Sequence, residues 1–141
     1  MAAHEDFGSA ALRHARDSEQ LFDSNHFDNA AYLAGYAVEC SFKVLLECTE
    51  RLSPKSLGHD LTNLAGRALS FARLLSPGMP RYRPDDVDVE FAFQRWTPEM
   101  RYEATGQVTQ DEAERLVRAG QACLDRIVFS LVLDGKLQVP T

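Results

Sequence analysis

Arginines and aromatic residues alternate between positions 81 and 102, and this mixture is the part of the sequence best suited to hold a ligand. Arg101 and Tyr102 follow the segment Trp96-Thr97-Pro98, and the upstream members are Arg81, Tyr82, Arg83 and Arg95. An aromatic ring can stack on a nucleobase while a guanidinium holds the neighbouring phosphate. Large aromatic residues are also common in hydrophobic cores, and we favour this second interpretation for the aromatic residues of the segment.

A second group of residues with chemical potential lies on one line of an expected helix. Glu39, Lys43 and Glu47 are spaced four residues apart within a stretch that is otherwise uncharged. An exposed Glu39–Lys43 pair would contribute only ~0.2 to 0.5 kcal/mol, and we favour this interpretation. If the helix is central, however, Glu39 is partly buried and requires a partner, because an unpaired buried charge is very costly. Arg101 and His59 are then the candidate partners.

His59 precedes a carboxylate, that of Asp60, at the expected start of a helix. Its imidazole could serve as a general acid or base together with Asp60 or Glu39. That chemistry needs a nucleophile or a substrate for which the sequence holds no motif. We therefore favour a loop residue whose ring helps to cap the following helix.

Neither metal binding nor disulfide bonding is indicated by the remaining histidines and cysteines. His4, His14 and His26 are dispersed, and no Cys-x-x-Cys or paired-histidine spacing occurs. The three cysteines each lie in an apolar helical pattern, which is typical of small core residues: Cys40, Cys48 and Cys123. We expect no metal site and no cofactor.

Length and composition are those of one globular domain. A chain of 141 residues, with 45% hydrophobic and 26% charged residues, can bury a core of its own. The formal net charge of -6 argues against a protein that coats nucleic acid by bulk attraction, so any contact with nucleic acid must be local. There is no run of ~18 apolar residues and no secretion signal, and we expect a cytoplasmic protein without membrane contact.

The element that must position these residues is a helix over residues 29–48. Its apolar side chains cover nearly the whole circumference, which predicts a helix that is buried on nearly all sides. Asp28 is a suitable N-cap, because its carboxylate can accept hydrogen bonds from the free amides of the next turn. Ser53-Pro54 predicts an end near Arg51.

Three further helices are indicated around this central one. An amphipathic helix is expected from Ser9 to Asp23, and a third from His59 or Asp60 to Leu75. The last is the best marked, because Thr109-x-x-Glu112 has the pattern of a capping box and Gly135 suits a left-handed C-terminal position.

The segment between the third and the last helix, residues 81–106, is expected to be largely irregular. Asp85 and Asp86 could cap a short helix that continues through Arg95, and we prefer this to a strand over Val87–Phe93, whose apolar residues alternate. The whole predicts an all-α fold, an antiparallel four- to five-helix up-and-down bundle in a single domain over residues 1–141, with its core over about 9–135.

Three strings of residues together resemble the HEPN family of small helical bundles. They are Leu33-Ala34-Gly35-Tyr36-Ala37-Val38-Glu39-Cys40 with Lys43, then Gly58-His59-Asp60-Leu61, then Trp96-x-Pro98-x-x-Arg101-Tyr102. The resemblance extends over residues 10–133. It implies a bundle that commonly forms a homodimer, sometimes with a small nucleotidyltransferase partner, in toxin–antitoxin, defence or RNA-processing systems.

The active ribonucleases of that family carry an arginine followed, after four to six residues, by a histidine. Counted from Arg101, the corresponding positions are Gly106, Gln107 and Val108, so the histidine is missing. We therefore expect a HEPN-like nucleotide- or RNA-associated binding module without ribonuclease activity, and we expect it to be a homodimer. The candidate ligand-binding residues are Arg101, Tyr102, Trp96, Glu39, Lys43 and His59.

Two alternative functions stay open at this point. One is a structural or antitoxin-type partner of a small nucleotidyltransferase. The other is a divergent HEPN ribonuclease that uses Arg101 without the usual histidine.

Overall fold

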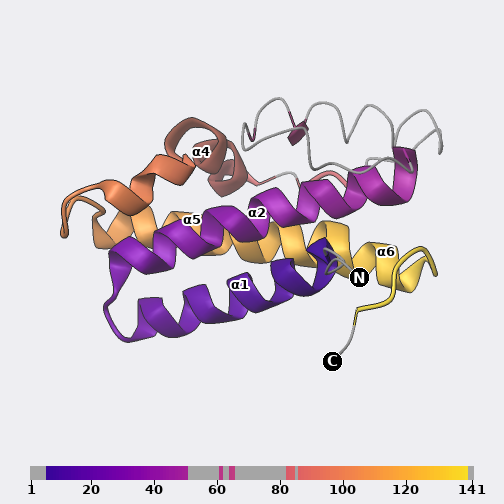
Figure 1. Ribbon diagram of the computed structural model, residues 1–141, viewed down its shortest axis with the longest axis horizontal. Coiled ribbons are helices and arrows are strands. Elements are labelled where there is room, and N and C mark those ends of the chain that lie inside the picture. Colours follow the sequence, from indigo (N-terminus) through magenta and orange to yellow (C-terminus); the bar gives the residue numbers. More distant parts are fainter. Residues whose placement is uncertain (1–5, 51–60, 62–63, 66–81, 85, 140–141) are drawn as a thin grey trace, which may run out of the picture.

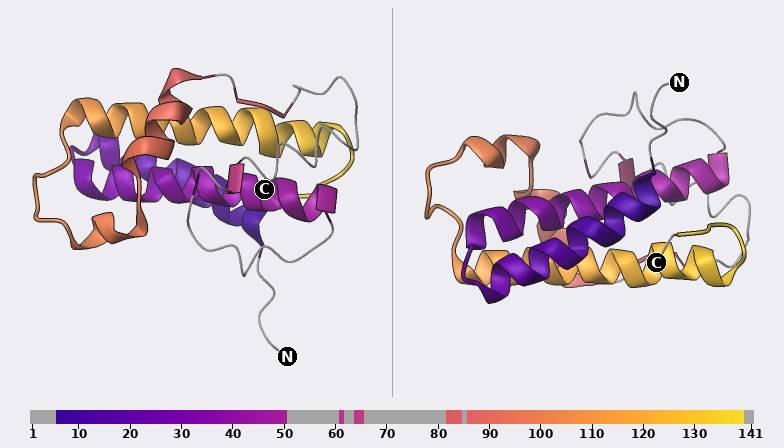
Figure 2. Two further views of the ribbon diagram at one scale, coloured as in Figure 1. Left: turned by 90° about the horizontal axis from the view of Figure 1, so that it is seen from above. Right: turned by 60° about the horizontal axis from the view of Figure 1, so that its bottom comes forward.

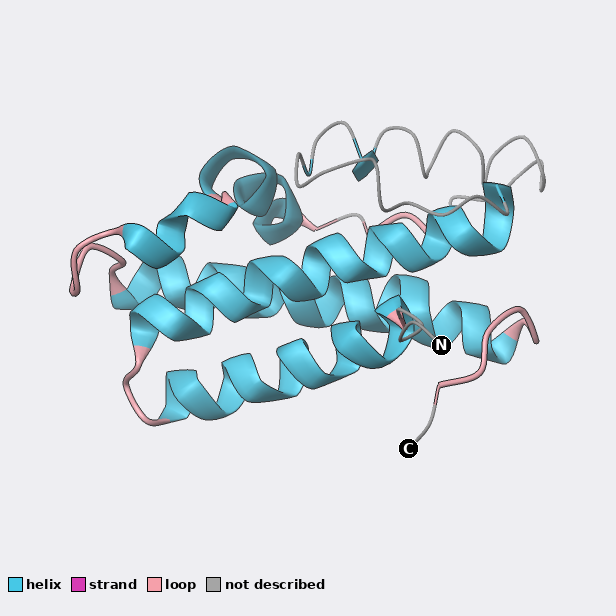
Figure 3. Ribbon diagram, in the orientation of Figure 1, coloured by secondary structure: helices cyan, strands magenta, loops and turns pink. Residues whose placement is uncertain are grey.

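The protein is all-α throughout the part of the chain that the structure describes. The computed structural model describes residues 6–50, 61, 64–65, 82–84 and 86–139. Its helices are α1 (Phe7–Asp23), α2 (Phe27–Glu50), α4 (Val87–Arg95), η2 (Pro98–Tyr102), α5 (Gln110–Cys123), η3 (Leu124–Phe129) and α6 (Ser130–Leu133). Figure 1 and Figure 3 show α1, α2 and α5 lying side by side, with α4 set across them.

The central position belongs to α2, as its sequence predicts. This helix packs against α1, α4 and α5, and also against η2 and η3. Its buried apolar residues point in nearly every direction: Ala30, Ala31, Ala34, Ala37, Val38, Phe42, Val44, Leu45 and Leu46. The two further views in Figure 2 show α1 and α5 against α2 from different sides, which explains why one helix needs so few polar residues.

The start of α2 differs from the prediction. The helix begins at Phe27, and the amide of Ala30 donates to the carbonyl of His26 at 2.9 Å, so Asp28 lies in the first turn and is not the N-cap. The preceding helix ends in a tight reversal in which Asn25 takes a left-handed conformation with φ of 65°. The His26 amide donates to the Leu21 carbonyl at 2.8 Å, a bond typical of a Schellman C-cap. This reversal makes α1 and α2 antiparallel neighbours.

The first helix is longer than predicted by two residues at its start. It begins at Phe7 instead of Ser9, because the carboxylate of Asp6 accepts from both the amide and the hydroxyl of Ser9 at 2.9 Å. Such an N-cap satisfies amides that would otherwise lack a partner.

The short helix predicted after Asp86 is present as α4, and the strand alternative over Val87–Phe93 is wrong. The Asp86 carboxylate accepts from the Asp88 amide at 2.7 Å, which starts the helix. Arg115 reinforces it, because its Nε donates to Asp88 Oδ1 at 3.1 Å and its guanidinium lies 4.0 Å from the Phe91 ring centre. Helical capping and pairing therefore prevail over the alternation of the apolar residues.

The last helix follows its two sequence signals. Thr109 and Glu112 form the reciprocal capping box, with the Glu112 amide donating to Thr109 Oγ1 at 3.1 Å and the Thr109 amide donating to Glu112 Oε1 at 3.2 Å. Gly135 has φ of 74° at the far end. Between these ends the chain passes from α5 through the π-helical turn η3 into α6, a feature that the sequence analysis did not predict.

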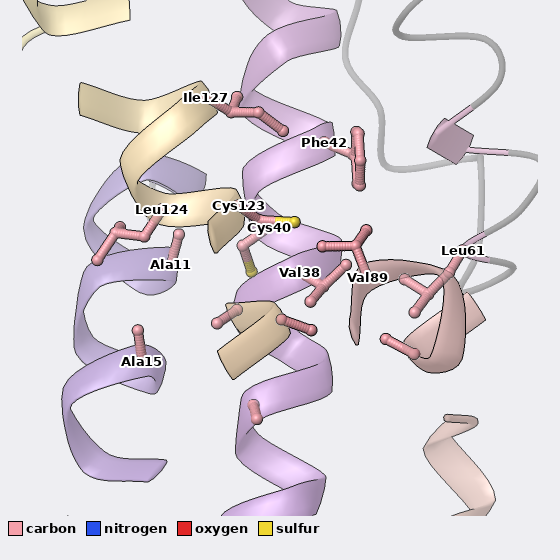
Figure 4. Close-up of a cluster of buried hydrophobic side chains, with 14 of the residues drawn as sticks. Ala11, Ala15, Val38, Cys40, Phe42, Leu61, Val89, Cys123, Leu124 and Ile127 are labelled. Atoms are coloured by element: carbon pink, nitrogen blue, oxygen red, sulfur yellow. The ribbon is translucent and has the colours of Figure 1, made fainter. Parts of the chain in front are cut away.

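The hydrophobic core lies where α1, α2, α4 and the last helix meet. Figure 4 shows Cys40 and Cys123 among buried side chains from these helices. All three cysteines are free thiols, and Cys48 packs partly buried against the core, so the prediction of core cysteines is confirmed. The third predicted helix falls mostly outside the described residues, although Leu61, Leu64 and Ala65 are buried.

Candidate functional site

Arg101 lies on the surface, at the end of a short 3₁₀ turn that the sequence starts with a proline. Trp96 and Thr97 are extended, and Pro98 then opens η2 with its fixed φ, so that Arg101 and Tyr102 emerge on the last turn. Arg101 Nη1 donates to the Tyr32 hydroxyl at 3.5 Å, and its guanidinium lies 4.7 Å from the centre of the Tyr102 ring. The hydrogen bond to Tyr32 raises the pKa of Arg101 above its ordinary value, so the side chain stays charged.

A cavity of about 290 Å³ adjoins Arg101. It lies between the first turns of α2 and the segment from η2 to residue 105, at the end of the bundle where that orange segment projects in Figure 1. Its lining is Asn25, His26, Phe27, Asp28, Asn29, Tyr32, Met100, Arg101, Glu103 and Thr105. We call this cavity the Arg101 pocket.

Both carboxylates of the Arg101 pocket are already engaged. Asp28 accepts from the amides of Gly106 and Val108 at 2.9 Å and 3.2 Å, which fastens the loop before α5 to the start of α2. Gly106 has φ of 90°, a conformation that a glycine adopts without strain. Glu103 accepts from Arg95 Nη2 at 3.1 Å.

Arg101 has no acidic partner among the described residues, unlike Arg95 on the preceding helix. Among the described residues no carboxylate lies within salt-bridge distance of its guanidinium. By contrast Arg95, Arg115 and Arg118 each pair with a carboxylate at 2.6 to 3.1 Å. A guanidinium held by a neutral hydroxyl and an aromatic face keeps its donors for an external anion, and the bidentate fork suits phosphate or carboxylate.

Trp96 supports the pocket from inside the protein and is not itself accessible. Its side chain is 3% exposed, and its Nε1 donates to the backbone carbonyl of Tyr32 at 3.0 Å. The ring lies so close to α2 that a Cβ added at Gly35 would come within 2.0 Å of it. The core interpretation of Trp96 is thus confirmed, and that of Tyr102 is wrong, because this side chain is 75% exposed.

Tyr32 is the residue of the site that the sequence analysis did not single out. Its hydroxyl accepts from Arg101 and donates to the hydroxyl of Tyr36 at 3.1 Å. Burial, followed by the bond to Tyr32, raises the pKa of Tyr36 above its ordinary value, so the Tyr36 phenol is a neutral donor and acceptor near neutral pH. The signal was available, since two tyrosines spaced by four residues share one face of a helix.

Glu39 and Lys43 lie elsewhere, inside the bundle, and the prediction of an exposed pair is wrong. Their exposed fractions are 2% and 6%, and Lys43 Nζ lies 3.4 Å from Glu39 Oε2. The reason is that α1 covers this face of α2, as shown by the ring of Phe7, whose centre is 5.4 Å from Lys43 Nζ. Glu39 therefore does not pair with Arg101, and neither residue lines the Arg101 pocket.

The other residues considered from sequence divide between core and undescribed segments. Tyr82 is buried at 1% exposure and donates to a carboxylate oxygen of Asp134. His59 and Arg81 lie outside the described residues. The structure thus places Arg101 at the pocket, with Trp96 packed behind it in the core, and separates it from Glu39 and Lys43. Tyr102 contacts the Arg101 guanidinium but does not itself line the pocket.

The remaining observations concern metals, membranes and known proteins. Within the described ranges no three His, Cys, Asp or Glu side chains are grouped as metal ligands would be. None of the helices described is both long and apolar enough to cross a lipid bilayer. Compared with known families, curated proteins and solved structures, the chain matches none of them.

Proposed function

We propose that the Arg101 pocket binds the phosphate of a nucleotide or of RNA, and that the protein does not cleave the RNA it binds. The observation that carries this proposal is the guanidinium of Arg101, which faces a cavity without a carboxylate partner among the described residues. The exposed ring of Tyr102, stacked against that guanidinium, offers a base a face to pack on.

The resemblance to the HEPN family gives this proposal its biochemical setting. We propose that the helices form an antiparallel up-and-down bundle of the HEPN type, with Arg101 at the position of the family's motif arginine. The three positions where a histidine would complete the motif are occupied by Gly106, Gln107 and Val108. Gly106 and Val108 give their amides to Asp28, which fastens this loop to the start of α2, and none of the three side chains can transfer a proton.

The proposal is tested by measuring binding and cleavage on the same protein. A short fluorescent RNA oligomer is titrated at several salt concentrations, and its integrity is checked on a gel after long incubation. We expect binding that weakens as salt rises, because each phosphate contact releases counterions, together with intact RNA. Cleavage would favour the third possibility, a divergent ribonuclease.

Variants of Arg101 locate the binding. Arg101→Ala should weaken binding by about 10-fold or more, and Arg101→Lys should recover only part of it, because an ammonium lacks the bidentate geometry. Arg118→Ala is the matched control, since Arg118 is exposed but paired with Glu114 at 2.6 Å. Equal binding by wild type and Arg101→Ala would reject the pocket, and absence of any nucleotide or RNA binding would direct attention to the nucleotidyltransferase partner instead.

A homodimer is part of the same proposal, because the family resemblance implies one. Light scattering at tens of micromolar protein should give twice the chain's mass of 15.8 kDa. A monomeric mass would contradict the expected assembly without affecting the binding test.

A further inference from the structure

The Arg101 pocket has an unusual balance of charges for a site that binds phosphate. With histidine counted as neutral, its lining holds one positive side chain, Arg101, and two negative ones, Asp28 and Glu103. Among the described residues of this lining there is no second lysine or arginine. Arg101 therefore supplies the one full positive side-chain charge that they offer an anion, beside the amide end of α2.

The two carboxylates are held in place by their own bonds. Asp28 is fixed by two backbone amides at 2.9 Å and 3.2 Å. Glu103 is fixed by Arg95, whose Nε also donates to Glu112 at 2.9 Å. Neither carboxylate can swing away from an approaching anion without losing these bonds, so both stay at the pocket. The charge of Glu103 is partly compensated by Arg95, whereas that of Asp28 faces only backbone amides.

A ligand with one negative charge and a ligand with several would meet these carboxylates differently. A phosphodiester carries one charge, which the fork of Arg101 can neutralise with two parallel hydrogen bonds. Each additional phosphate adds negative charge that finds no further cation in the lining and approaches Asp28 or Glu103. At separations of ~8 Å, such a repulsion weakens binding by roughly 2- to 30-fold, depending on how well water screens it.

We infer that the Arg101 pocket selects a singly charged phosphodiester and discriminates against nucleoside di- and triphosphates, with Glu103 as a specificity-determining residue. This inference rests on the proposed function of the same pocket. The cavity of about 290 Å³ is at the small end of ligand pockets, which suits a single nucleotide unit held by Arg101. The diester can belong to a nucleic acid strand or to a cyclic nucleotide, which share this chemistry.

The test compares ligands of one base and increasing charge without divalent metal ions. Calorimetric titration of the purified protein with the dinucleoside monophosphate ApA, cyclic AMP, AMP, ADP and ATP should give affinities that fall from the diesters to ATP. The discrimination between ApA and ATP should be on the order of tenfold or more. A preference for ApA over cyclic AMP identifies a strand as the source of the diester, and the reverse identifies a cyclic nucleotide; either result supports the inference.

A variant that removes the charge of Glu103 tests whether this residue determines the selectivity. Glu103→Gln should raise ATP affinity more than ApA affinity and so reduce their ratio by roughly 2- to 30-fold. Glu90→Gln removes the same charge from an exposed residue of α4 and should leave the ratio unchanged. Circular dichroism checks that both variants keep the helical fold.

The outcomes separate the inference from the proposed function. If none of the ligands binds and RNA does not bind either, the proposed function fails. If ATP binds as tightly as ApA or more tightly, the pocket binds phosphate without selecting charge, and the inference is overturned while the function stands. A ratio that Glu103→Gln does not change would overturn the role of Glu103.

Discussion

Two charged systems lie at α2: the Glu39–Lys43 pair within the helix, and Arg101, which contacts the helix from η2. They differ in burial, in the partners of their charges and in access to a cavity. Glu39 and Lys43 lie inside the bundle at 2% and 6% exposure, with their charges 3.4 Å apart. Arg101 lies on the surface beside the start of α2. Its guanidinium contacts the hydroxyl of Tyr32, which precedes Glu39 on that helix, and the ring of Tyr102. The first system is closed to water and to ligands, whereas the second borders a cavity.

This difference shows how the same types of residue serve stability in one place and recognition in another. A buried charge must be neutralised within the protein, because desolvation makes an unpaired ion very costly. An exposed charge is solvated by water and can exchange that water for a ligand. The comparison therefore predicts opposite outcomes for mutations in the two systems, with large losses of stability at the buried pair and losses of binding at Arg101.

The largest expected effect is at the buried pair. Glu39→Gln strands the ammonium of Lys43 in the core and should lower the free energy of unfolding by about 3 to 5 kcal/mol in a denaturant titration. Glu114→Gln is the matched control, because it breaks an i,i+4 pair with the largely exposed Arg118 and should cost only ~0.3 to 0.5 kcal/mol. Equal losses in the two variants would mean that burial does not distinguish these pairs.

The next effect concerns the close contact between Trp96 and α2 at Gly35. Gly35→Ala would place a Cβ about 2.0 Å from Trp96 Cδ1 and Nε1, so the indole must move away from α2. Overpacking of this kind costs about 1 to 3 kcal/mol, and the lost bond from Trp96 to the Tyr32 carbonyl should also weaken ligand binding.

Gly120→Ala provides the control for that experiment. Its nearest neighbour, the carbonyl of Ala34, would lie 3.3 Å from the new Cβ. Because alanine also favours the helix, the net change in stability should be less than ~1 kcal/mol. Binding that survives Gly35→Ala at full strength would show that Trp96 does not position the pocket.

A smaller effect is expected from pH, at the half-buried His14 of α1. Burial, and then the charge of Arg13, lowers the pKa of His14 below its ordinary value of 6.5. The unfolded chain then binds the proton more readily than the folded one, so this contribution to stability is complete above pH 6.5 and is lost as the pH falls toward the lowered pKa.

Thermal melting between pH 5 and pH 7.5 checks this sign. The slope should stay below the ~1.4 kcal/mol per pH unit that one proton can produce, and His14→Gln should flatten it. A stability that rises as the pH falls through this range would contradict the assignment. The affinity of Arg101 for a phosphodiester should change little over the same range, since the raised pKa keeps its guanidinium charged.

The smallest expected effect on stability is at the proposed binding residue. Arg101→Ala removes a contact of 3.5 Å to a hydroxyl and an exposed stacking contact, which should change the free energy of unfolding by no more than ~0.5 kcal/mol. Chemical denaturation measures this beside the binding assay. A loss comparable with that of Glu39→Gln would make Arg101 a structural residue and remove the contrast between the two systems.

The fold could be predicted wherever one local signal decides the structure. The capping box of Thr109 and Glu112 and the left-handed Gly135 marked the last helix correctly, and Asp86 marked the start of α4. These signals act within a few residues, and here the residues that carry them make the local contacts expected of them. The start of α2 was missed because Asp28 uses its carboxylate on amides about eighty positions away instead of on its own helix.

The site was predictable only in part, for a related physical reason. A helix that is apolar nearly all round, such as α2, does not tell which face its neighbours will cover, so Glu39 and Lys43 were expected at the surface. Arg101 and Tyr102 were identified by residue type and spacing. Tyr32 was not, because its role depends on how η2 packs across the start of α2, and this packing joins segments far apart in the chain.

The two hydrogen bonds of Asp28 also determine when the pocket can exist during folding. They span 78 and 80 positions of the chain, and the bond from Arg101 to Tyr32 spans 69. Contacts over such sequence distances form late, because the entropy of closing a long loop is lost before any contact compensates for it. The α1–α2 hairpin is local and can form while synthesis continues, but it has no ligand site of its own. The pocket appears only after residue 108 has left the ribosome and its loop has docked on α2, so a nascent chain acquires its helices before it acquires its ability to bind.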